Sequence, residues 1–397
     1  MQRVVALGVV VLIIVIGVIQ LLRPLPSVQA QSLQSGFTVP GAAPRIPWPA
    51  GTEVALQVPE AGWSQSYGTT QPLPIGSLAK MMTAYLLLKQ HPLASGAQGP
   101  SITVTEADVQ LYQHEVATQQ SLVPLVVGES LSERQCLEAL LVASGNDIAE
   151  MVASWVSGSN AKFTALMNST AKQMGMTHTH YVGPSGLRSG TVSTPQDQLI
   201  LAEAAMKNST FAELAAMPQM TWPNTTGLIY NYNYDVGHDG IVGVKTGSTI
   251  QAGGCFVFAA PRKVGSQQVM VYGAILGRKA TSSQSIGQLK LALNDGISLL
   301  NAVSGSLTTA TPVHSGQVVG ELKAPWGAKV SLQATQSVTT PAVQSTRGTE
   351  QLVWHPSAKG TGSGVLKLQM QQKMWTVPVR AAGTLAPPPL SWKLLRL

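Results

Sequence analysis

The hydrophobic pattern begins with an uninterrupted apolar run near the start of the chain. The run from Val4 to Leu22 holds nineteen residues without a charge. In a helix that rises 1.5 Å per residue, this run extends over about 28 Å, close to the thickness of the hydrocarbon core of a bilayer. The small-residue pattern Val28-Gln29-Ala30 is typical of a signal-peptide cleavage site. Residues 1–30 are therefore predicted to be a cleaved signal peptide or an uncleaved anchor, and either one places residues 31–397 outside the cytoplasm.

Strand and helix patterns alternate up to about residue 300. The stretches Thr52–Val58 and Gly62–Gly68, separated by turn residues, predict a β-hairpin. Helices are expected to begin at Ser77 and at Ser132, where Ser132 and Gln135 have the spacing of a capping box. Further helices are predicted near 148–155, 163–174, 194–206 and 282–300, and further strands near 241–248, 253–260 and 269–276. The apolar strands predict a sheet covered on both faces.

The pattern changes beyond Gly305, where short alternating runs are separated by Gly and Pro turns. These runs predict a small all-β module over 304–385. They cover residues 317–319, 329–332, 351–354, 365–368 and 375–379. The last stretch, 386–397, mixes apolar and cationic residues and is predicted to be a short amphipathic tail suited to contact with a membrane surface. Residues 31–47 are rich in Ser, Gly, Pro and Ala and are predicted to be a linker, which leaves 48–303 as the first folded domain.

Charge is sparse and unevenly distributed. Charged residues make up 11% of the chain, and the formal charge is +7. Residues 305–397 hold nine Lys or Arg against two Glu, so the whole excess lies in the β module and the tail that follows it. This excess indicates either contact with an anionic partner, such as phospholipid or an acidic wall polymer, or simply a soluble basic module. Because the cations are scattered and no basic helix occurs, a nucleic-acid partner is not expected.

The cysteines and the paired histidines offer little chemistry. Cys136 and Cys255 lie in apolar surroundings and are expected to be small core residues, although a disulfide between them stays open in this compartment. His178 and His180 are two residues apart, which does not match the spacing of a helical metal pair. No acidic residue or third histidine lies near them in the sequence, so we expect no metal site.

One short segment carries the residues of nucleophilic catalysis. Ser77 and Lys80 are about one helical turn apart, directly before an apolar run, so both side chains project from one face. A serine hydroxyl is a poor nucleophile until a base takes its proton. A lysine can be that base when burial or other cations lower its pKa. The spacing alone is weak evidence, because it is common by chance.

Two later segments are ambiguous when each is considered alone. Ser144 and Asn146 lie in a short loop between two apolar helices, which would hold polar side chains rigidly but is equally consistent with a capping turn in which Asn146 or Asp147 is the cap. The strand segment Lys245-Thr246-Gly247 offers a cation, a hydroxyl and a bare backbone that a bound ligand could approach closely. It is equally consistent with a strand that ends in a turn.

The three segments together match a known pattern. S-x-x-K, S-x-N and K-T-G occur here in the order found in penicillin-binding proteins. From about Thr52 to Leu300 the chain resembles the D-alanyl-D-alanine carboxypeptidases, the low-molecular-mass penicillin-binding proteins of the serine peptidase type. The likeness includes Lys80-Met81-Met82-Thr83, Ser144-Gly145-Asn146-Asp147, Pro184-Ser185-Gly186-Leu187 and Lys245-Thr246-Gly247. It implies an α/β (α+β) domain of the serine β-lactamase/transpeptidase type, with helices flanking a sheet. The basic β module resembles the family's C-terminal domain less closely.

The resemblance implies three catalytic residues. Ser77 attacks the carbonyl between two D-alanines, and Lys80 takes the proton of its hydroxyl. Ser144 relays a proton to the departing amine. Lys80 and Lys245, as neighbouring cations, are expected to lower each other's pKa.

The resemblance also implies five substrate-binding residues. Asn146 holds the substrate amide and orients the catalytic lysine. Thr246 and Lys245 bind the free carboxylate, on a strand whose Gly247 keeps the backbone bare. The backbone N–H of Ser248 and that of the nucleophile form the oxyanion hole. No metal or cofactor is implied.

The expected substrates are peptidoglycan stem pentapeptides, with β-lactams as inhibitors that acylate Ser77 and leave slowly. Members of the family often carry an arginine well after the K-T-G strand, but Arg278 is not clearly at that position and is left out of the site. Three alternatives remain from the sequence. They are a D,D-endopeptidase, a β-lactamase of the same fold, and a non-catalytic wall-binding homologue.

Overall fold

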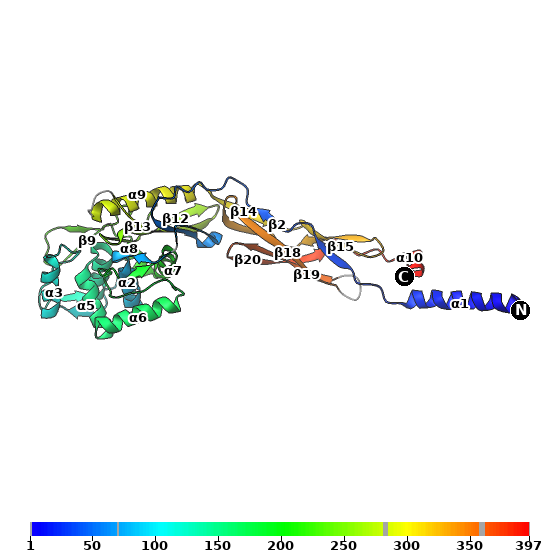
Figure 1. Cartoon of the computed structure of the whole chain (residues 1–397), viewed down its shortest axis with the longest axis horizontal. Helices are drawn as coiled ribbons and strands as arrows, with labels where there is room; N and C mark the ends of the chain where they lie inside the picture. Colours follow the sequence, from blue (N-terminus) through cyan, green and yellow to red (C-terminus); the bar gives the residue numbers. More distant parts are fainter. Residues whose placement is uncertain (1, 70, 281–284, 357–361, 397) are drawn as a thin grey trace. The chain divides into compact units, whose positions relative to one another are not determined.

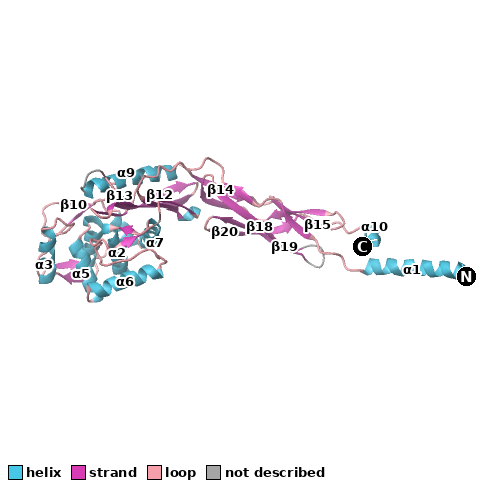
Figure 2. Cartoon of the chain, viewed as in Figure 1, coloured by secondary structure: helices cyan, strands magenta, loops and turns pink. Residues whose placement is uncertain are grey.

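The computed structural model describes residues 2–69, 71–280, 285–356 and 362–396, and the chain forms two compact units. The first, called here the α/β unit, is Pro44–Leu307. The second, called here the β unit, combines Met1–Ala43 with Thr308–Leu397. Figure 2 shows that helices and strands are mixed in the α/β unit, whereas the β unit is made mainly of strands.

A five-stranded antiparallel sheet lies at the centre of the α/β unit, with the strand order β11-β12-β13-β3-β4. Its strands are β3 (Glu53–Val58), β4 (Trp63–Tyr67), β11 (Val244–Thr249), β12 (Gly253–Val264) and β13 (Gln267–Arg278). The predicted hairpin is confirmed by the pairing of β3 with β4. The strands β12 and β13 extend beyond the predicted apolar runs because their polar ends also pair, as in Arg262 with Val269. The strand β11 pairs only with β12 and therefore forms one edge of the sheet.

Helices cover both faces of this sheet, as the sequence predicts. Figure 1 shows α9 (Ser285–Ser304) on one side of the sheet, with α2 (Ala79–Gln90) and α7 (Pro195–Met206) on the other. The helix α9 packs on β11, β12 and β13, and α7 packs on β3 and β13. Residues 282–284 of the helix predicted over 282–300 lie outside the described residues. The remaining elements of the unit are β5 (Leu73–Pro74), β6 (Ser101–Thr103), α3 (Glu106–Val116), β7 (Ser130–Ser132), α4 (Glu133–Glu138), α5 (Asn146–Ser157), α6 (Asn160–Gln173), β8 (Val192–Ser193), α8 (Ser209–Ala215), β9 (Gln219–Thr221) and β10 (Leu228–Tyr230).

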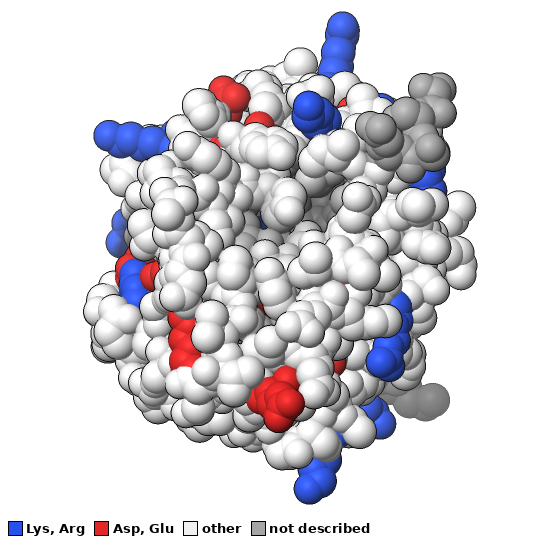
Figure 3. Space-filling view, turned by 90° about the vertical axis from the view of Figure 1, so that its left-hand side faces the viewer, with Lys and Arg blue, Asp and Glu red and all other residues white. Residues whose placement is uncertain are grey.

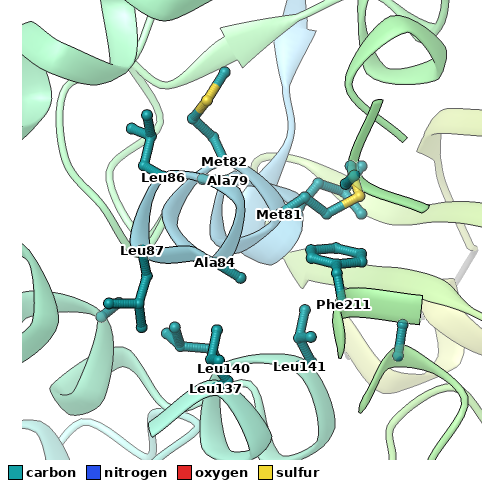
Figure 4. Packing of buried hydrophobic residues seen from close by; sticks show 14 of the residues in the cluster. Ala79, Met81, Met82, Ala84, Leu86, Leu87, Leu137, Leu140, Leu141 and Phe211 are labelled. Atoms are coloured by element: carbon teal, nitrogen blue, oxygen red, sulfur yellow. The ribbon is translucent and has the colours of Figure 1, made fainter. Parts of the chain in front are cut away.

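The helix α2 is buried on nearly all sides, which explains why its sequence is apolar around its whole circumference. Figure 4 shows Met81, Ala84 and Leu87 of α2 among apolar side chains of other elements. The leucines Leu137 and Leu140 come from α4 and the turn that follows it, and α8 contributes a phenylalanine. A polar side chain on this helix is therefore held by close packing in a medium of low polarity.

The β unit is built on a seven-stranded sheet in the order β1-β15-β16-β20-β19-β18-β2. Its elements are α1 (Gln2–Leu22), β1 (Gln29–Ser32), β2 (Gly36–Thr38), β14 (Leu307–Val313), β15 (Val318–Lys323), β16 (Lys329–Ala334), β17 (Val338–Val343), β18 (Arg347–Pro356), β19 (Gly362–Met370), β20 (Lys373–Ala381) and α10 (Leu390–Leu395). Each of the five runs predicted as strands lies on one of these strands, and β14 pairs with β17 in a separate ladder.

One prediction needs correction, and one alternative that the sequence left open is excluded. The segment 31–47 is wrong as a plain linker, because β1 pairs with β15 and β2 pairs with β18. The polar and small residues of this segment gave no strand signal, because an edge strand needs no apolar pattern when its partner strand supplies the hydrogen bonds. The possible disulfide does not form, because Cys136 and Cys255 are both buried free thiols.

Candidate active site

The nucleophile candidate Ser77 lies on a short 3₁₀ turn, Gly76–Leu78, that leads directly into α2. Its side chain is partly exposed, whereas both neighbours on the turn are buried. Gly76 has φ = 52°, a conformation that favours glycine. The turn thus presents the serine at the positive end of the α2 dipole, as its predicted place in a first helical turn requires.

The side chain of Lys80 is fully buried and makes three short polar contacts. Its Nζ lies 2.9 Å from Ser77 Oγ, 2.6 Å from Asn146 Oδ1 and 3.0 Å from the Ser185 carbonyl oxygen. The carbonyl belongs to the loop at 183–187, which also accepts a hydrogen bond from Thr83. The lysine is therefore fixed with one contact to the candidate nucleophile and two to orienting groups.

Burial sets the basicity of this lysine. It lowers the pKa of Lys80 from the usual 10.5 to about 7, although nearby carboxyl groups, first that of Asp147, oppose the shift. Burial, and then repulsion by Lys80, also lower the pKa of Lys245. The predicted mutual effect of the two lysines thus accounts for part of the shift at Lys245, whereas at Lys80 the cause is burial. Above about pH 7 the neutral Nζ of Lys80 can accept the hydroxyl proton of Ser77.

The second motif follows a π-helical turn, Ala139–Ala143, after which Ser144 has φ = 58°. The helix α5 then begins at Asn146, and Gly145 is its N-cap residue without a side-chain cap. The alternative in which Asn146 or Asp147 caps the helix is therefore wrong. Instead, the carboxylate of Asp147 accepts hydrogen bonds from the backbone N–H of Ile148, at 2.9 Å, and of Val123, at 3.1 Å.

The segment 117–125, which sequence analysis did not single out, supports this loop. The Asn146 backbone N–H donates to the Ser121 carbonyl at 2.8 Å, and its side-chain amide donates to Gln120 Oε1 at 3.4 Å. With the Val123–Asp147 bond, three contacts fix the S-x-N loop to this segment. No periodic or compositional signal marks the segment, because its role depends on contacts between residues about 25 positions apart.

The third motif lies on the edge strand β11, where Lys245 is buried. Its Nζ donates to Ser144 Oγ at 3.0 Å and to the Thr246 carbonyl at 3.1 Å. The S-x-N and K-T-G motifs are therefore joined by a direct hydrogen bond, and Lys80 joins the S-x-x-K and S-x-N motifs. All three motifs meet at one site.

Gly247 is required by contact within the chain itself. A Cβ at this position would lie 2.6 Å from the Ile75 carbonyl oxygen and 3.1 Å from the backbone nitrogens of Ser77 and Leu78. The space in the Cβ direction of this glycine is thus occupied by the nucleophile turn, and the glycine also lines the cleft described below. A Cβ at Gly76 would in turn lie 3.3 Å from the Ser248 nitrogen. The nucleophile turn and β11 are therefore in direct contact, and they carry the backbone N–H groups of Ser77 and Ser248, respectively.

A cleft of about 190 Å³ opens over these motifs. Its lining includes Ser77, Ser144 and the β11 segment 246–248, together with residues that sequence analysis missed. The missed residues are Gln119, Ser121, Tyr232, Ser285, Ile286 and Leu289. Figure 3 shows a hollow in one face of the molecule, surrounded mainly by uncharged side chains, in agreement with the uncharged lining of the cleft.

Two further observations define the surroundings of the cleft. Arg278 forms an ion pair with Asp295 of α9 at 2.6 Å, which supports its omission from the site. The Ser248 hydroxyl donates to the Ser285 carbonyl at 2.6 Å and so connects β11 to the start of α9. Within the described residues, no three His, Cys, Asp or Glu side chains are grouped as a metal site requires.

Comparison with known proteins then identifies the family. A family model described as D-alanyl-D-alanine carboxypeptidase, peptidase family S11, matches residues 65–276, slightly more than half of the chain. The chain belongs to this family. Members of the family are serine-type carboxypeptidases and low-molecular-mass penicillin-binding proteins.

Several curated carboxypeptidases are similar in sequence. The D-alanyl-D-alanine carboxypeptidase of Streptomyces sp. strain K15 is 34% identical over 209 residues, which cover 47% of this chain and 68% of that protein. DacB2 of Mycobacterium tuberculosis is 32% identical over 211 residues, or 51% of this chain and 67% of that protein. DacD of Escherichia coli K12 is 26% identical over 372 residues, or 88% of this chain and 85% of that protein.

Solved structures support the same fold. The DD-transpeptidase of Streptomyces K15 has a TM-score of 0.54 at 26% identity and covers 66% of this chain and 98% of its own. DacD of Francisella tularensis has a TM-score of 0.63 at 19% identity and covers 87% of this chain and 96% of its own. The second match is longer than the α/β unit, so the likeness in fold extends into the β unit. The predicted transpeptidase-like fold with a C-terminal β domain is confirmed.

Proposed function

We propose that the protein is a serine D-Ala-D-Ala carboxypeptidase that removes the terminal D-alanine from peptidoglycan stem pentapeptides through an acyl-enzyme on Ser77. The observation that carries the proposal is the hydrogen-bonded chain Ser77–Lys80–Asn146, which meets Ser144–Lys245 over one cleft. Family membership supports the reaction class.

Acylation begins when neutral Lys80 accepts the hydroxyl proton of Ser77 and the serine oxygen attacks the carbonyl carbon between the two D-alanines. The carbonyl electron pair moves onto oxygen, where the backbone N–H groups of Ser77 and Ser248 stabilise the oxyanion. When the intermediate collapses, the C–N bond breaks, and the departing nitrogen takes through Ser144 the proton that Lys80 had accepted from Ser77, so that Lys80 is neutral again. The hydrogen bond from Lys245 to the Ser144 hydroxyl supports this relay.

The substrate carboxylate binds beside the strand β11. Lys245 supplies positive charge and Thr246 a hydroxyl, both on the edge strand β11. Asn146 binds the substrate amide with its side chain while its Oδ1 keeps Lys80 in place. Water then attacks the ester while Lys80 accepts one of its protons, the Ser77–acyl bond breaks, and Lys80 passes that proton to the serine oxygen. A β-lactam acylates the same serine but leaves slowly.

The reaction is assigned to the outside of the cytoplasmic membrane, where peptidoglycan stem peptides are exposed. The helix α1, which over Arg3–Leu22 is long and apolar enough to cross a membrane, supports this location as a signal or an anchor. The basic β unit is suited to contact with phospholipid or with an anionic wall polymer.

The proposal is tested by two measurements on the purified full chain. Covalent labelling with a fluorescent penicillin is expected for the wild type, as is release of D-alanine from a synthetic stem pentapeptide. Ser77→Ala is expected to lose both while its unfolding transition is unchanged. A folded Ser77→Ala variant that still releases D-alanine would refute the role of Ser77. Penicillin labelling without D-alanine release would refute the carboxypeptidase activity, and rapid loss of the label would favour a β-lactamase.

A second candidate is transfer of the acyl group to an amine instead of water. The Streptomyces K15 structure carries the name DD-transpeptidase, and a Pseudomonas aeruginosa relative, 30% identical over 193 residues, is named an endopeptidase. Transpeptidation and endopeptidase cleavage both proceed through the same type of acyl-enzyme as hydrolysis. Mass spectrometry of the products with an added D-amino acid or a cross-linked dimer as substrate distinguishes transfer, endopeptidase cleavage and hydrolysis.

A further inference from the structure

The apolar helix α1 contacts the last helix of the chain, α10, within the β unit. The Arg396 guanidinium donates to the Gln20 carbonyl at 2.8 Å, to the Pro24 carbonyl at 3.1 Å and also to the Arg23 carbonyl. In return, Gln20 Nε2 donates to the Arg396 carbonyl at 3.1 Å. The carbonyls at the end of a helix lack partners within the helix, and a cation there is also favoured by the dipole. Arg396 therefore acts as a cap for α1.

The strand after α1 continues this attachment into the folded β unit. Gln29 pairs with Lys323, Ala30 with Leu322, Gln31 with Glu321 and Ser32 with Gly320. These four pairs place the predicted cleavage point, directly after Ala30, in the middle of a continuous ladder. Val28 packs against the core of the β unit. Cleavage after Ala30 would thus remove half of an edge strand and the whole partner of Arg396.

Most of the surface of α1 makes no contact with the rest of the chain as far as the structure describes it. Its apolar side chains are exposed, with exposed fractions of 75% for Val4 and 63% for Ile13, for example, and none of its most apolar segment is buried. At 1.5 Å per residue, the segment Arg3–Leu22 spans about 30 Å, the thickness of the hydrocarbon core of a bilayer. This surface matches the interior of a bilayer.

The residues next to the end of α1 have the composition of a membrane interface. Trp392 of α10 packs edge-on against Trp326, with ring centroids 5.5 Å apart, and the Arg396 guanidinium lies over the Trp392 ring. Leu395 is 80% exposed, and Lys393 adds a further cation. Tryptophan, cations and exposed leucines on a short helix are typical of segments that lie between lipid headgroups and acyl chains.

We propose that α1 is retained in the mature protein as a transmembrane anchor, and that α10 is fastened to its outer end by Arg396 and lies in the headgroup layer of the lipid bilayer. The partner surface is therefore the outer leaflet, contacted at one place by both ends of the β unit. The outer side is assigned on the basis of the proposed function, whereas the retained helix and the α1–α10 contact do not depend on it.

The first test is the mass of the mature chain. The full chain is expressed in a bacterial host, extracted from membranes with detergent and measured by intact-mass spectrometry. The expected product retains residues 2–22 and stays in the membrane after washing with high salt and carbonate. A mature chain that begins near Gln31 would overturn the proposal.

The second test places an environment-sensitive dye on α10 of the full chain in lipid nanodiscs. Leu395→Cys carries the dye, and Met374→Cys, at a 77% exposed position on β20, is the matched control. The native cysteines are buried and do not compete for the dye. Quenching by a lipid-borne quencher is expected to be roughly twofold or more stronger at 395 than at 374. Equal quenching would overturn the placement of α10.

The role of Arg396 is tested in the same labelled protein. Arg396→Ala is expected to reduce the quenching at 395 toward the control level, because α10 loses its attachment to α1. Arg380→Ala, an exposed arginine on β20, is expected to leave it unchanged. Unchanged quenching in Arg396→Ala would overturn the role of this arginine as the fastening. Because neither mass nor quenching depends on D-alanine release, failure here is distinct from failure of the proposed reaction.

Discussion

Gly247→Ala offers a sharp test of how the site is assembled. The new methyl group would lie 2.6 Å from the Ile75 carbonyl oxygen, whereas ordinary contact begins at 3.4 Å, so β11 and the nucleophile turn must separate by about 0.8 Å. The three nearest atoms are backbone atoms, which cannot move aside as a side chain can. Overpacking of this kind costs about 1–3 kcal/mol of stability. A displacement near 1 Å at a reacting centre costs about 10²-fold in rate.

The assay is the second-order rate of acylation by a fluorescent penicillin, combined with urea unfolding. Gly247→Ala is expected to acylate about 10²-fold more slowly while it remains folded at the assay temperature. Gly227→Ala is the matched control, because no atom lies within 4 Å of its added Cβ, and it is expected to behave as the wild type. Wild-type acylation and unchanged stability in Gly247→Ala would show that the close approach is not what positions the nucleophile.

Three further predictions concern ionisable groups. Acylation by penicillin is expected to rise with pH through about 7, since Lys80 accepts a proton only when its Nζ is neutral, and a flat profile from pH 5 to 9 would contradict this. Asp147→Ala is expected to slow acylation about tenfold or more by freeing the S-x-N loop from Val123, with penicillin labelling rates as the measurement and retained rates as the contrary result. Glu133 is buried, and neither of its carboxyl oxygens has a hydrogen-bond partner among the described residues. Burial raises its pKa from 4.5 to about 7. Between these values the folded state binds more protons than the unfolded state, so stability falls as pH rises. Glu133→Gln is therefore expected to gain about 2 kcal/mol relative to wild type between pH 5 and pH 8 in urea unfolding, whereas the exposed control Glu106→Gln gains little.

The three motifs could be located from the sequence because each motif is local. The spacing of Ser77 and Lys80 depends on one helical turn, and the β11 segment is read directly as Lys245-Thr246-Gly247. Both faces of the sheet were also predictable, since β12 and β13 are apolar over most of their length. The hairpin of β3 and β4 followed from its turn residues.

Other features depend on contacts that no local pattern encodes. The strand β1 consists of Gln, Ala, Gln and Ser, and only its partner β15 makes it a strand. The support from Ser121 and Val123 to the S-x-N loop is likewise visible only in three dimensions. The close contact of Gly247 with the nucleophile turn could not be predicted, because sequence shows that a backbone is bare but not which segment of the chain approaches it.

The electrostatics at Lys80 show the same limit. Two lysines in one motif set suggest mutual repulsion, and the structure retains that effect at Lys245. The larger cause at Lys80 is complete burial within the core around α2, opposed by the carboxyl groups of Asp147, Glu115 and Glu150. The degree of burial depends on packing by elements distant in sequence, so the basicity of the lysine could not be derived from spacing alone.

The central claim is that the oxygen of Ser77 carries the acyl group, and peptide mapping of the trapped adduct tests it most directly. The full chain is treated with a slowly hydrolysed β-lactam, digested, and sequenced by tandem mass spectrometry. The added mass is expected on the peptide that contains Ser77, localised to that residue, and is expected to be absent from Ser77→Ala. An adduct on Ser144, on Ser248 or on any other residue would contradict the account.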